Sequence, residues 1–238
     1  SNTYGPSRGG KWLTKPRDLT IINYSRKLRD DTCITMRYWD SKGSPFPVRR
    51  IPLFFYLSDD YRECLQRLEI SIRLRRGLNI IIGQVGTGKT TLSRVLYRMF
   101  QRESRDFIFH FILDPSFPTE FQFFSNLVTL FDIKPSGRST FEYKEAIQNY
   151  LFQKGVEEGK TIVLLIDEGQ KLSIPHLEIL RNLLNYETNE YKLLQLLIFA
   201  QMEFSNRVKG VENFLDRVNL KYVFLPLNEI NTRKMIEF

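Results

Sequence analysis

The sequence predicts an α/β fold in three layers, in which helices cover both faces of a parallel sheet of five strands. Two observations lead to this class. Helical and strand patterns alternate from about residue 59 to residue 226, and the five strand-like runs are short and almost entirely apolar. Strands without a polar side need cover on both faces, and crossover helices between parallel strands supply it.

Each predicted helix places apolar residues three or four positions apart, and each predicted strand is a short apolar run between turn residues. The helices are expected, in chain order, at 59–76, 90–102, 119–131, 141–153 and 175–186. The strands are expected at 79–82, 107–113, 161–167, 193–200 and 221–226. We expect the strand 107–113 to be buried and to end at Asp114 and Pro115. Pro175 opens the last helix, because proline is favoured in a first helical turn.

The composition is that of an ordinary soluble globular protein. Of the 238 residues, 42% are hydrophobic and 26% are charged, so a sizeable core can form. No apolar run reaches the roughly 18 residues that a membrane-spanning helix needs, and the first residues lack the apolar stretch of a signal peptide. Two cysteines, Cys33 and Cys64, make neither a disulfide framework nor a metal-ligand pattern. We therefore expect a cytoplasmic protein with free thiols.

The positive charge of the chain is concentrated near its beginning. The formal net charge is +8, and residues 1–50 hold eleven Lys and Arg against four Asp, a balance of +7. Residues 51–238 hold 24 basic and 23 acidic residues, a balance of +1. Because nucleic-acid binding needs a local excess of Lys and Arg, the charge of the core gives little independent support for a DNA-binding role. DNA stays an open but less favoured partner.

The two ends differ in character from the middle of the chain. Residues 1–35 are rich in Gly, Ser, Pro and Arg and show no sustained period, so we expect a poorly ordered basic leader. Met36 is a plausible natural start, and the predicted core runs over 36–227. A further helical pattern follows Pro226 and occupies 228–238.

A phosphate-binding loop is the first specific motif. The stretch GQVGTGKT, residues 83–90, follows a predicted strand and precedes a predicted helix, and it has the form G-x-x-x-x-G-K-[ST]. Glycines let the backbone wrap around phosphate oxygens, and the helix N-terminus supplies positive potential. Lys89 is expected to reach the β- and γ-phosphates of ATP, and Thr90 to coordinate Mg²⁺. The predicted nucleotide-binding residues are Gly83, Gln84, Val85, Gly86, Thr87, Gly88, Lys89, Thr90 and Thr91.

An acidic pair, Asp167 and Glu168, lies at the end of the predicted strand 161–167, whose last residue is Asp167. A carboxylate at a strand tip can hold Mg²⁺ through water, and we assign this role to Asp167. The adjacent Glu168 is expected to polarise the attacking water as the catalytic base. An isolated Asp-Glu pair is often only a solvated strand end, but a phosphate loop upstream favours the functional interpretation.

The strand 107–113, which lies between the two motifs, is typical of phosphate-loop ATPases with a strand-borne catalytic glutamate. In such ATPases a polar residue at the tip of the next strand senses the γ-phosphate. Gln201 follows the strand 193–200, so it either contacts the phosphate and the lytic water or merely caps the strand. An arginine from a neighbouring subunit would stabilise the transition state. Arg217 is the first candidate and Arg207 the second, although both are equally compatible with an ordinary surface position.

The two histidines and one basic stripe have simpler interpretations. His110 lies inside an apolar strand and is expected to be a hydrogen-bonded core residue. His176 lies in the first turn of a predicted helix and is expected to be exposed. The arginines between 94 and 105 recur three or four positions apart, as on a solvated helix face, and a subunit or nucleic-acid contact stays open.

From about Tyr38 onward the chain resembles the AAA+ ATPases of the general secretion pathway A (ExeA-like) type. The resemblance lies in the segments YWDSKGSPFPVRR, GQVGTGKTTL, LLIDEGQKLS, LRNLLNYETNEYKLLQLLIFAQMEF and DRVNLKYVFLPLNE. That family is similar to the ATPases that regulate transposition. The resemblance implies an AAA+ P-loop NTPase fold, ATP hydrolysis with Mg²⁺, a homo-oligomer with nucleotide at subunit boundaries, and a partner protein of an envelope secretion system.

The chain also departs from that family. Gly169 stands where the family usually has Ala, and Ala200 to Glu203 stand where it has Gly-Gln-Pro-Glu. By resemblance, 228–238 begin a helical lid whose remainder, like the membrane-spanning part, lies outside this sequence, so a tether to the inner membrane stays open. We favour a role in assembling a secretion or pilus-like envelope system. The alternatives are a DNA-associated ATPase that regulates transposition and a nucleotide-dependent scaffold without significant turnover.

Overall fold

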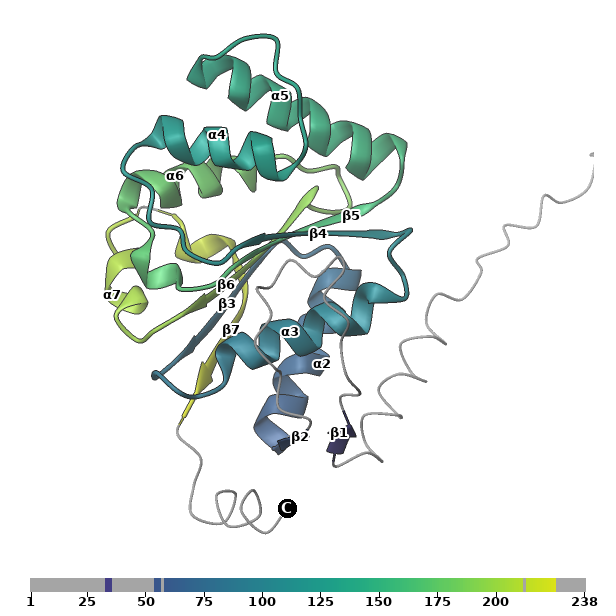
Figure 1. Cartoon of the computed structure of the whole chain (residues 1–238), viewed down its shortest axis with the longest axis vertical. Coiled ribbons are helices and arrows are strands. Elements are labelled where there is room, and N and C mark those ends of the chain that lie inside the picture. Colours follow the sequence, from purple (N-terminus) through teal and green to yellow (C-terminus); the bar gives the residue numbers. More distant parts are fainter. Residues whose placement is uncertain (1–32, 36–53, 57, 212, 226–238) are drawn as a thin grey trace, which may run out of the picture. The chain divides into compact units, whose positions relative to one another are not determined.

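A parallel sheet of five strands forms the centre of the fold, as predicted (Figure 1). The structure is a computed structural model, and it describes residues 33–35, 54–56, 58–211 and 213–225. The chain divides into two units, residues 1–32 and 33–238, and every described residue belongs to the second unit. The strands of the sheet are β3 (Leu78–Gly83), β4 (Phe107–Ile112), β5 (Thr161–Ile166), β6 (Leu194–Ala200) and β7 (Val218–Phe224).

The strand order is β4-β5-β6-β3-β7, so β6 lies between the strands that precede the phosphate loop and the acidic pair. Ile82 of β3 pairs with Ala200 of β6, and Ile166 of β5 pairs with Ile198 of β6. Every residue of β3, β5 and β6 is buried. This burial explains their continuous apolar sequence.

The edge strands differ from the predictions in two respects. In β4 only Ile112 is fully buried, so the prediction of a buried strand is wrong for most of its length. Its position at the edge of the sheet leaves one side of the strand without a neighbour. At the other edge, β7 begins at Val218, three residues before the predicted start, and its side chains alternate between more and less exposed. That alternation is typical of a half-covered strand and gives no continuous apolar run.

Helices cover both faces of the sheet, which gives the three layers that the sequence predicts (Figure 1). One layer contains α2 (Asp59–Arg73) and α3 (Lys89–Gln101). The opposite layer contains α4 (Glu120–Leu130), α5 (Thr140–Phe152) and α6 (Ile174–Leu183). Hydroxyl side chains cap four of these helices, namely Ser58, Thr119, Ser139 and Ser173. Each accepts a hydrogen bond from a first-turn amide that has no partner within the helix.

Several short elements have no counterpart among the predictions, because each is only three to five residues long. A π-helical turn, η1 (Gln153–Glu157), continues α5, and two 3₁₀ turns, η2 (Gly169–Lys171) and η3 (Leu215–Arg217), follow β5 and precede β7. A short helix, α7 (Phe204–Val208), follows β6. The strands β1 (Cys33–Thr35) and β2 (Phe54–Tyr56) pair antiparallel as a separate two-stranded sheet.

The predicted leader and lid fall largely outside the described residues. Strand β1 occupies the end of the range expected to be a leader, and residues 226–238 are not described. Within the described ranges, no helix is both long enough and apolar enough to cross a membrane. Cys64 is a buried free thiol, as expected.

Candidate functional site

Three predicted site segments meet at one edge of the sheet because their strands are parallel neighbours. The phosphate loop begins at the carboxyl end of β3, Asp167 follows β5, and Gln201 follows β6, which lies between those two strands. In open α/β sheets, ligands bind in the crevice outside the carboxyl ends of the strands. The topology therefore places all three segments together at the carboxyl ends of neighbouring strands, where ligands of such sheets bind.

The phosphate loop has backbone geometry that requires glycine. Gly86 and Gly88 adopt φ angles of 81° and 78°, in the left-handed region that residues with a Cβ rarely enter. A Cβ at Gly88 would lie 2.6 Å from the hydroxyl oxygen of Tyr61, and one at Gly83 would lie 2.7 Å from Thr87 Oγ1. Gly83 and Gly88 therefore lie too close to neighbouring side chains to carry a Cβ.

The N-terminus of α3 is open to an anion. Gly88 occupies the N-cap position, and no side chain among the described residues caps this helix, in contrast to the four capped helices. The first amides of a helix have no intrahelical acceptor, and together with the helix dipole they favour a negative charge. A phosphate group provides that charge together with several acceptor oxygens.

Lys89 is the first residue of α3 and is almost completely buried. Its Nζ donates hydrogen bonds to the carbonyl oxygens of Gly83 and Gln84, at 2.8 and 2.7 Å. An ammonium group has three donors, so one remains for a further acceptor. Burial lowers the pKa of Lys89, while the charges of the nearby acids, Asp167 foremost among them, act in the opposite direction.

A direct hydrogen bond joins the phosphate loop to the acidic strand tip. Thr90 Oγ1 donates to Asp167 Oδ2 at 2.7 Å, and the Asp167 side chain is 6% exposed. Its other oxygen accepts a hydrogen bond from the backbone N–H of Glu168 at 3.0 Å. Burial raises the pKa of Asp167, although both hydrogen bonds act to lower it. The two residues assigned to Mg²⁺ are therefore in contact.

Glu168 adopts an uncommon backbone conformation, with φ of 55°, where β5 turns into η2. Its Oε2 accepts a hydrogen bond of 2.6 Å from Nε2 of Gln170, and Oε1 of Gln170 accepts one of 3.0 Å from the backbone N–H of Gln201. Gln170 was not among the predicted site residues. Its position in the stretch DEGQ, two residues after Glu168, was the available signal.

The residues present fit a magnesium ion held jointly with a phosphate ligand. Within the described ranges, no cluster of three or more His, Cys, Asp and Glu residues could hold a metal alone. Mg²⁺ typically binds one or two carboxylates together with substrate phosphates and water. The hydroxyl of Thr90 and the carboxylate of Asp167 are suitable oxygen donors for that arrangement.

The other predicted site residues differ in how far they are exposed to solvent. Val85 is 79% exposed at the tip of the loop, and Gln84 is also exposed. Thr91 and the side chain of Gln201 are half-buried. Gln201 contributes its backbone N–H to Gln170, and its predicted contact with a γ-phosphate stays a prediction.

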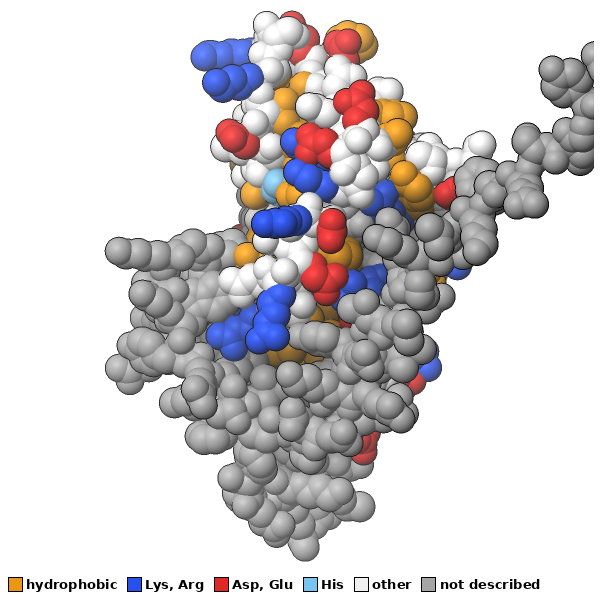
Figure 2. Space-filling model, turned by 90° about the vertical axis from the view of Figure 1, so that its right-hand side faces the viewer, with side chains coloured by type: hydrophobic (Ala, Val, Ile, Leu, Met, Phe, Trp, Pro, Cys, Tyr) orange, Lys and Arg blue, Asp and Glu red, His pale blue; other side chains and the backbone are white. Residues whose placement is uncertain are grey.

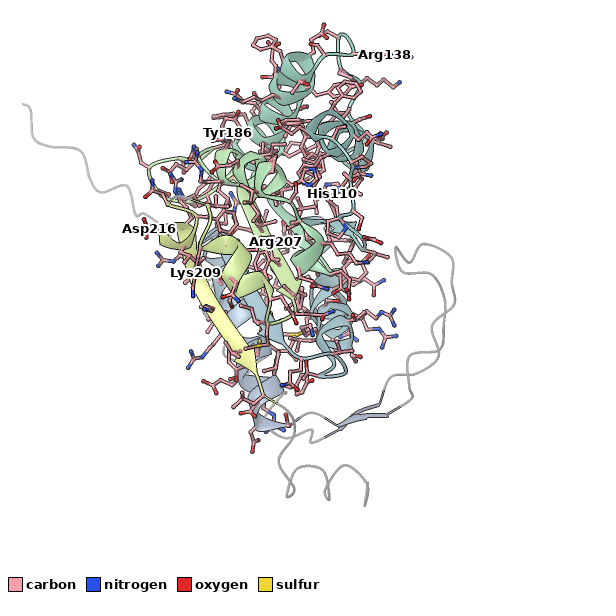
Figure 3. The ribbon with its side chains drawn as sticks, turned by 90° about the vertical axis from the view of Figure 1, so that its left-hand side faces the viewer. His110, Arg138, Tyr186, Arg207, Lys209 and Asp216 are labelled. Carbon is pink, nitrogen blue, oxygen red and sulfur yellow. The ribbon has the colours of Figure 1, made fainter. Side chains whose placement is uncertain are left out.

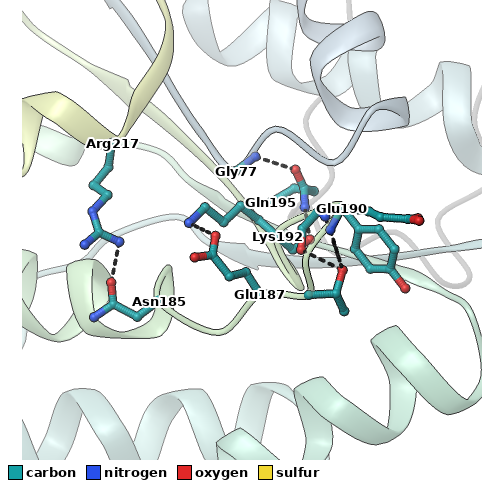
Figure 4. A network of polar contacts seen from close by, with 9 residues as sticks. Gly77, Asn185, Glu187, Glu190, Lys192, Gln195 and Arg217 are labelled. Carbon is teal, nitrogen blue, oxygen red and sulfur yellow. Dashed lines mark hydrogen bonds and ion pairs between the residues drawn. The ribbon is translucent and has the colours of Figure 1, made fainter.

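Arg217 lies at the opposite end of the strands from Lys89. It directly precedes Val218, which pairs with Leu78 at the beginning of β3, whereas the phosphate loop follows the end of β3. The seven residues of β7 span roughly 20 Å. Nη1 of Arg217 donates to Oδ1 of Asn185, beside the turn that links α6 to β6 (Figure 4). Arg217 therefore cannot reach the site of its own chain.

Arg207, the second candidate, lies on α7 (Figure 3). Its Nη1 donates to the carbonyl oxygen of Leu172 at 2.8 Å, just after η2. This contact ties α7 to the turn that follows the acidic pair. Arg207 is therefore engaged within its own chain.

The two histidines lie in the layer of α4, α5 and α6 or against it. His110 is hydrogen-bonded, as predicted: Nε2 lies 3.0 Å from the hydroxyl oxygen of Tyr150, and burial lowers its pKa to about 4. The prediction for His176 is wrong, because its side chain is only 3% exposed. His176 completes a capping box with Ser173 and stacks on Phe123, so a residue of the first helical turn is buried.

The chain is similar in sequence to known proteins over most of its length. The family described as AAA domain matches residues 72–208. General secretion pathway protein A of Aeromonas hydrophila is 31% identical over 199 residues, which cover 82% of this chain and 35% of that protein. The chain thus spans about a third of the length of that relative.

Two solved structures share the fold. The Aeropyrum pernix ORC2 protein, in complexes with ADPNP and ADP, is 15% identical with a TM-score of 0.57, covering 83% of this chain and 53% of its own. CDC6P from Pyrobaculum aerophilum is 18% identical with a TM-score of 0.59, covering 82% and 51%. These likenesses confirm the predicted P-loop NTPase fold.

Proposed function

Because the chain belongs to the AAA domain family, we propose that it binds ATP with Mg²⁺ at the carboxyl ends of β3, β5 and β6 and hydrolyses it. The observation that carries the proposal is the 2.7 Å hydrogen bond from Thr90 to Asp167. It brings a loop suited to phosphates and a strand tip suited to a metal into one site. The ORC2 protein, which shares the fold, forms complexes with ADPNP and ADP, and these nucleotides agree with the proposed class of ligand.

The residues have separate tasks in the proposed reaction. The amides at the start of α3 and the Lys89 ammonium hold the β- and γ-phosphates. Thr90 and Asp167 hold Mg²⁺, which when bound neutralises charge on the phosphate oxygens. Glu168 accepts a proton from the attacking water, and Gln201 orients the water or the γ-phosphate.

A neighbouring copy of the chain completes the proposed site. Arg217 lies at the amino end of β7, so it serves the nucleotide of another subunit rather than its own. The side chain of Asn185 accepts a hydrogen bond from the Arg217 guanidinium and holds it near the amino end of β7 (Figure 4). A guanidinium beside the transferring phosphoryl group stabilises the charge that develops there. Activity is therefore expected to depend on homo-oligomerisation.

The proposed biological role is ATP-driven assembly of an envelope secretion system through a partner protein of that system. The name of the relative from Aeromonas hydrophila supports this role. A DNA-associated role is less favoured because residues 51–238 are nearly balanced in charge. On the face shown in Figure 2, the described Lys and Arg side chains are interspersed with Asp and Glu. Binding to a DNA duplex that weakens steeply with salt and persists without residues 1–35 would favour the DNA role instead.

The test is the variant Glu168→Gln, which keeps the size of the side chain and one acceptor oxygen but removes the base. We expect ATP affinity within about twofold of the wild type and turnover reduced by roughly a hundredfold or more. Glu145→Gln, at an exposed position of α5, is the matched control and should behave as the wild type. Equal turnover in both variants would remove Glu168 from the reaction, and ATP binding without turnover in the wild type would indicate a scaffold.

A further inference from the structure

Glu168 is not free to rotate, because the side chain of Gln170 holds one of its oxygens. The 2.6 Å contact from Nε2 of Gln170 occupies Oε2 of Glu168 and leaves Oε1 for another donor. A carboxylate has about four acceptor sites on its two oxygens, so one hydrogen bond orients it without exhausting it. A general base works best when a third group fixes its direction.

The amide of Gln170 can be oriented in only one way. Its Oε1 lies 3.0 Å from the backbone nitrogen of Gln201, and a backbone N–H can only donate. The oxygen must therefore face Gln201, and the NH₂ group must face Glu168. The backbone N–H of Gln201, just after β6, thus determines that the NH₂ group of Gln170, and not its oxygen, faces the Glu168 carboxylate.

Close packing of η2 against β6 makes this bridge possible. A Cβ at Gly169 would lie 2.3 Å from Cγ2 of Ile198 and 3.3 Å from the carbonyl oxygen of Phe199. Because Gly169 has no Cβ, the turn can approach the strand this closely. The turn that carries Gln170 is therefore packed directly against β6, whose last residue, Ala200, precedes Gln201.

We propose that Gln170 is a positioning residue that aligns Glu168 and couples it to the tip of β6. The inference rests on the proposed ATPase function and extends it. Gln201, expected at the γ-phosphate, and Glu168, expected at the water, are joined through one side-chain amide. A shift of Gln201 on contact with the γ-phosphate is thereby transmitted to the base.

The decisive variant is Gln170→Glu, measured on the full chain. One oxygen of the new carboxylate still accepts from the N–H of Gln201, so the tie between the turn and β6 is kept. The other oxygen replaces the donor and repels Glu168. We expect kcat to fall roughly ten- to a hundredfold, with KM for ATP and the Kd of a fluorescent ATP analogue within about twofold of the wild type.

Gln170→Leu removes both hydrogen bonds, and a fall in kcat of at least the same size is expected if the variant folds. Gln122→Glu, at an exposed position of α4, controls for the change of charge and should leave kcat unchanged. Wild-type kcat in Gln170→Glu, together with loss of turnover in Glu168→Gln, would overturn this inference alone. Equal turnover in the wild type and Glu168→Gln, or none in the wild type, would overturn the proposed function as well.

Discussion

The hydroxyl of Thr90 donates a hydrogen bond of 2.7 Å to Oδ2 of Asp167, 77 positions further along the chain. Thr90 belongs to the first turn of α3, which follows β3, and Asp167 follows β5, so the bond joins segments that follow the two neighbours of β6 in the sheet. Because Asp167 is buried, its charge depends on such partners. The same two oxygen atoms are the ligands proposed to coordinate Mg²⁺.

Replacement of Lys89 by Met tests the phosphate loop. Lys89→Met removes the ammonium group that donates to Gly83 and Gln84 and that is proposed to reach the phosphates. We expect the Kd for ATP to rise at least roughly tenfold, which corresponds to about 1.4 kcal/mol. Isothermal titration calorimetry measures it. Lys144→Met, at an exposed position of α5, is the control, and equal affinities in the two variants would contradict the assignment.

Mixing two inactive variants tests the role of Arg217. Arg217→Ala should lower kcat by roughly a hundredfold or more while ATP affinity changes little, because the arginine acts only in the transition state. A mixture of Arg217→Ala with Lys89→Met should regain part of the activity, since an intact loop can then meet an intact arginine. Wild-type kcat in Arg217→Ala, or a loss of kcat that mixing does not recover, would refute action between subunits. Arg207→Ala, which loses its contact with Leu172, should not complement in this way.

The variant Gly169→Ala tests the close approach of η2 to β6. An added Cβ would collide with Ile198 on a fully buried strand, so we expect a loss of about 1 to 3 kcal/mol in the free energy of unfolding. Urea denaturation measures this loss. Gly210→Ala, where the nearest atom would be 3.4 Å away, should change stability by less than about 0.5 kcal/mol. A smaller loss in Gly169→Ala than in the control would disprove the steric explanation.

The half-buried His110 predicts a loss of stability in mild acid. Its pKa is lowered to about 4 in the folded protein, against about 6.5 in an unfolded chain. Between these values the unfolded state binds a proton that the folded state does not, so stability is full above pH 6.5 and falls as the pH falls towards 4. From pH 7 to pH 5, His110 should account for about 1 to 2 kcal/mol of this loss.

His110→Phe keeps a ring beside Phe131 but cannot titrate. The variant should be less stable at pH 7, because the hydroxyl of Tyr150 loses its partner, yet it should lose less stability than the wild type between pH 7 and pH 5. Urea denaturation across the pH series provides the comparison. Parallel pH profiles of the two proteins would show that His110 does not titrate as described.

The amino-acid sequence is sufficient for the features that depend on short contiguous patterns. The phosphate loop and the acidic pair each need particular residue types at fixed spacing beside a strand, so both are recognisable from the residues alone. The three strands at the centre of the sheet, β3, β5 and β6, agree with their predicted ranges to within one residue at either end. Their burial on both faces leaves an unbroken apolar run as a signal.

Features that depend on tertiary neighbours could not be predicted in this way. FIFHFIL is as apolar as a central strand, and only the strand order shows that β4 lies at an edge. His176 was expected to be exposed because its position in a first turn says nothing of Phe123, which covers it. Gln170 was missed because its partner, the backbone N–H of Gln201, is 31 residues away and becomes adjacent only through the pairing of β5 and β6.

A double-mutant cycle between Thr90→Val and Asp167→Asn on the affinity for Mg²⁺-ATP tests the central claim most directly. If both residues serve one metal-bound triphosphate, each variant should weaken Mg²⁺-ATP binding by about tenfold, with little change for ATP without the metal. The double variant should then be hardly weaker than the single variants, which gives a coupling energy of about 1 kcal/mol or more. A shared site would be contradicted if the losses of binding free energy in the two single variants added in full in the double variant. It would also be contradicted if the single variants lost equal affinity for ATP without Mg²⁺.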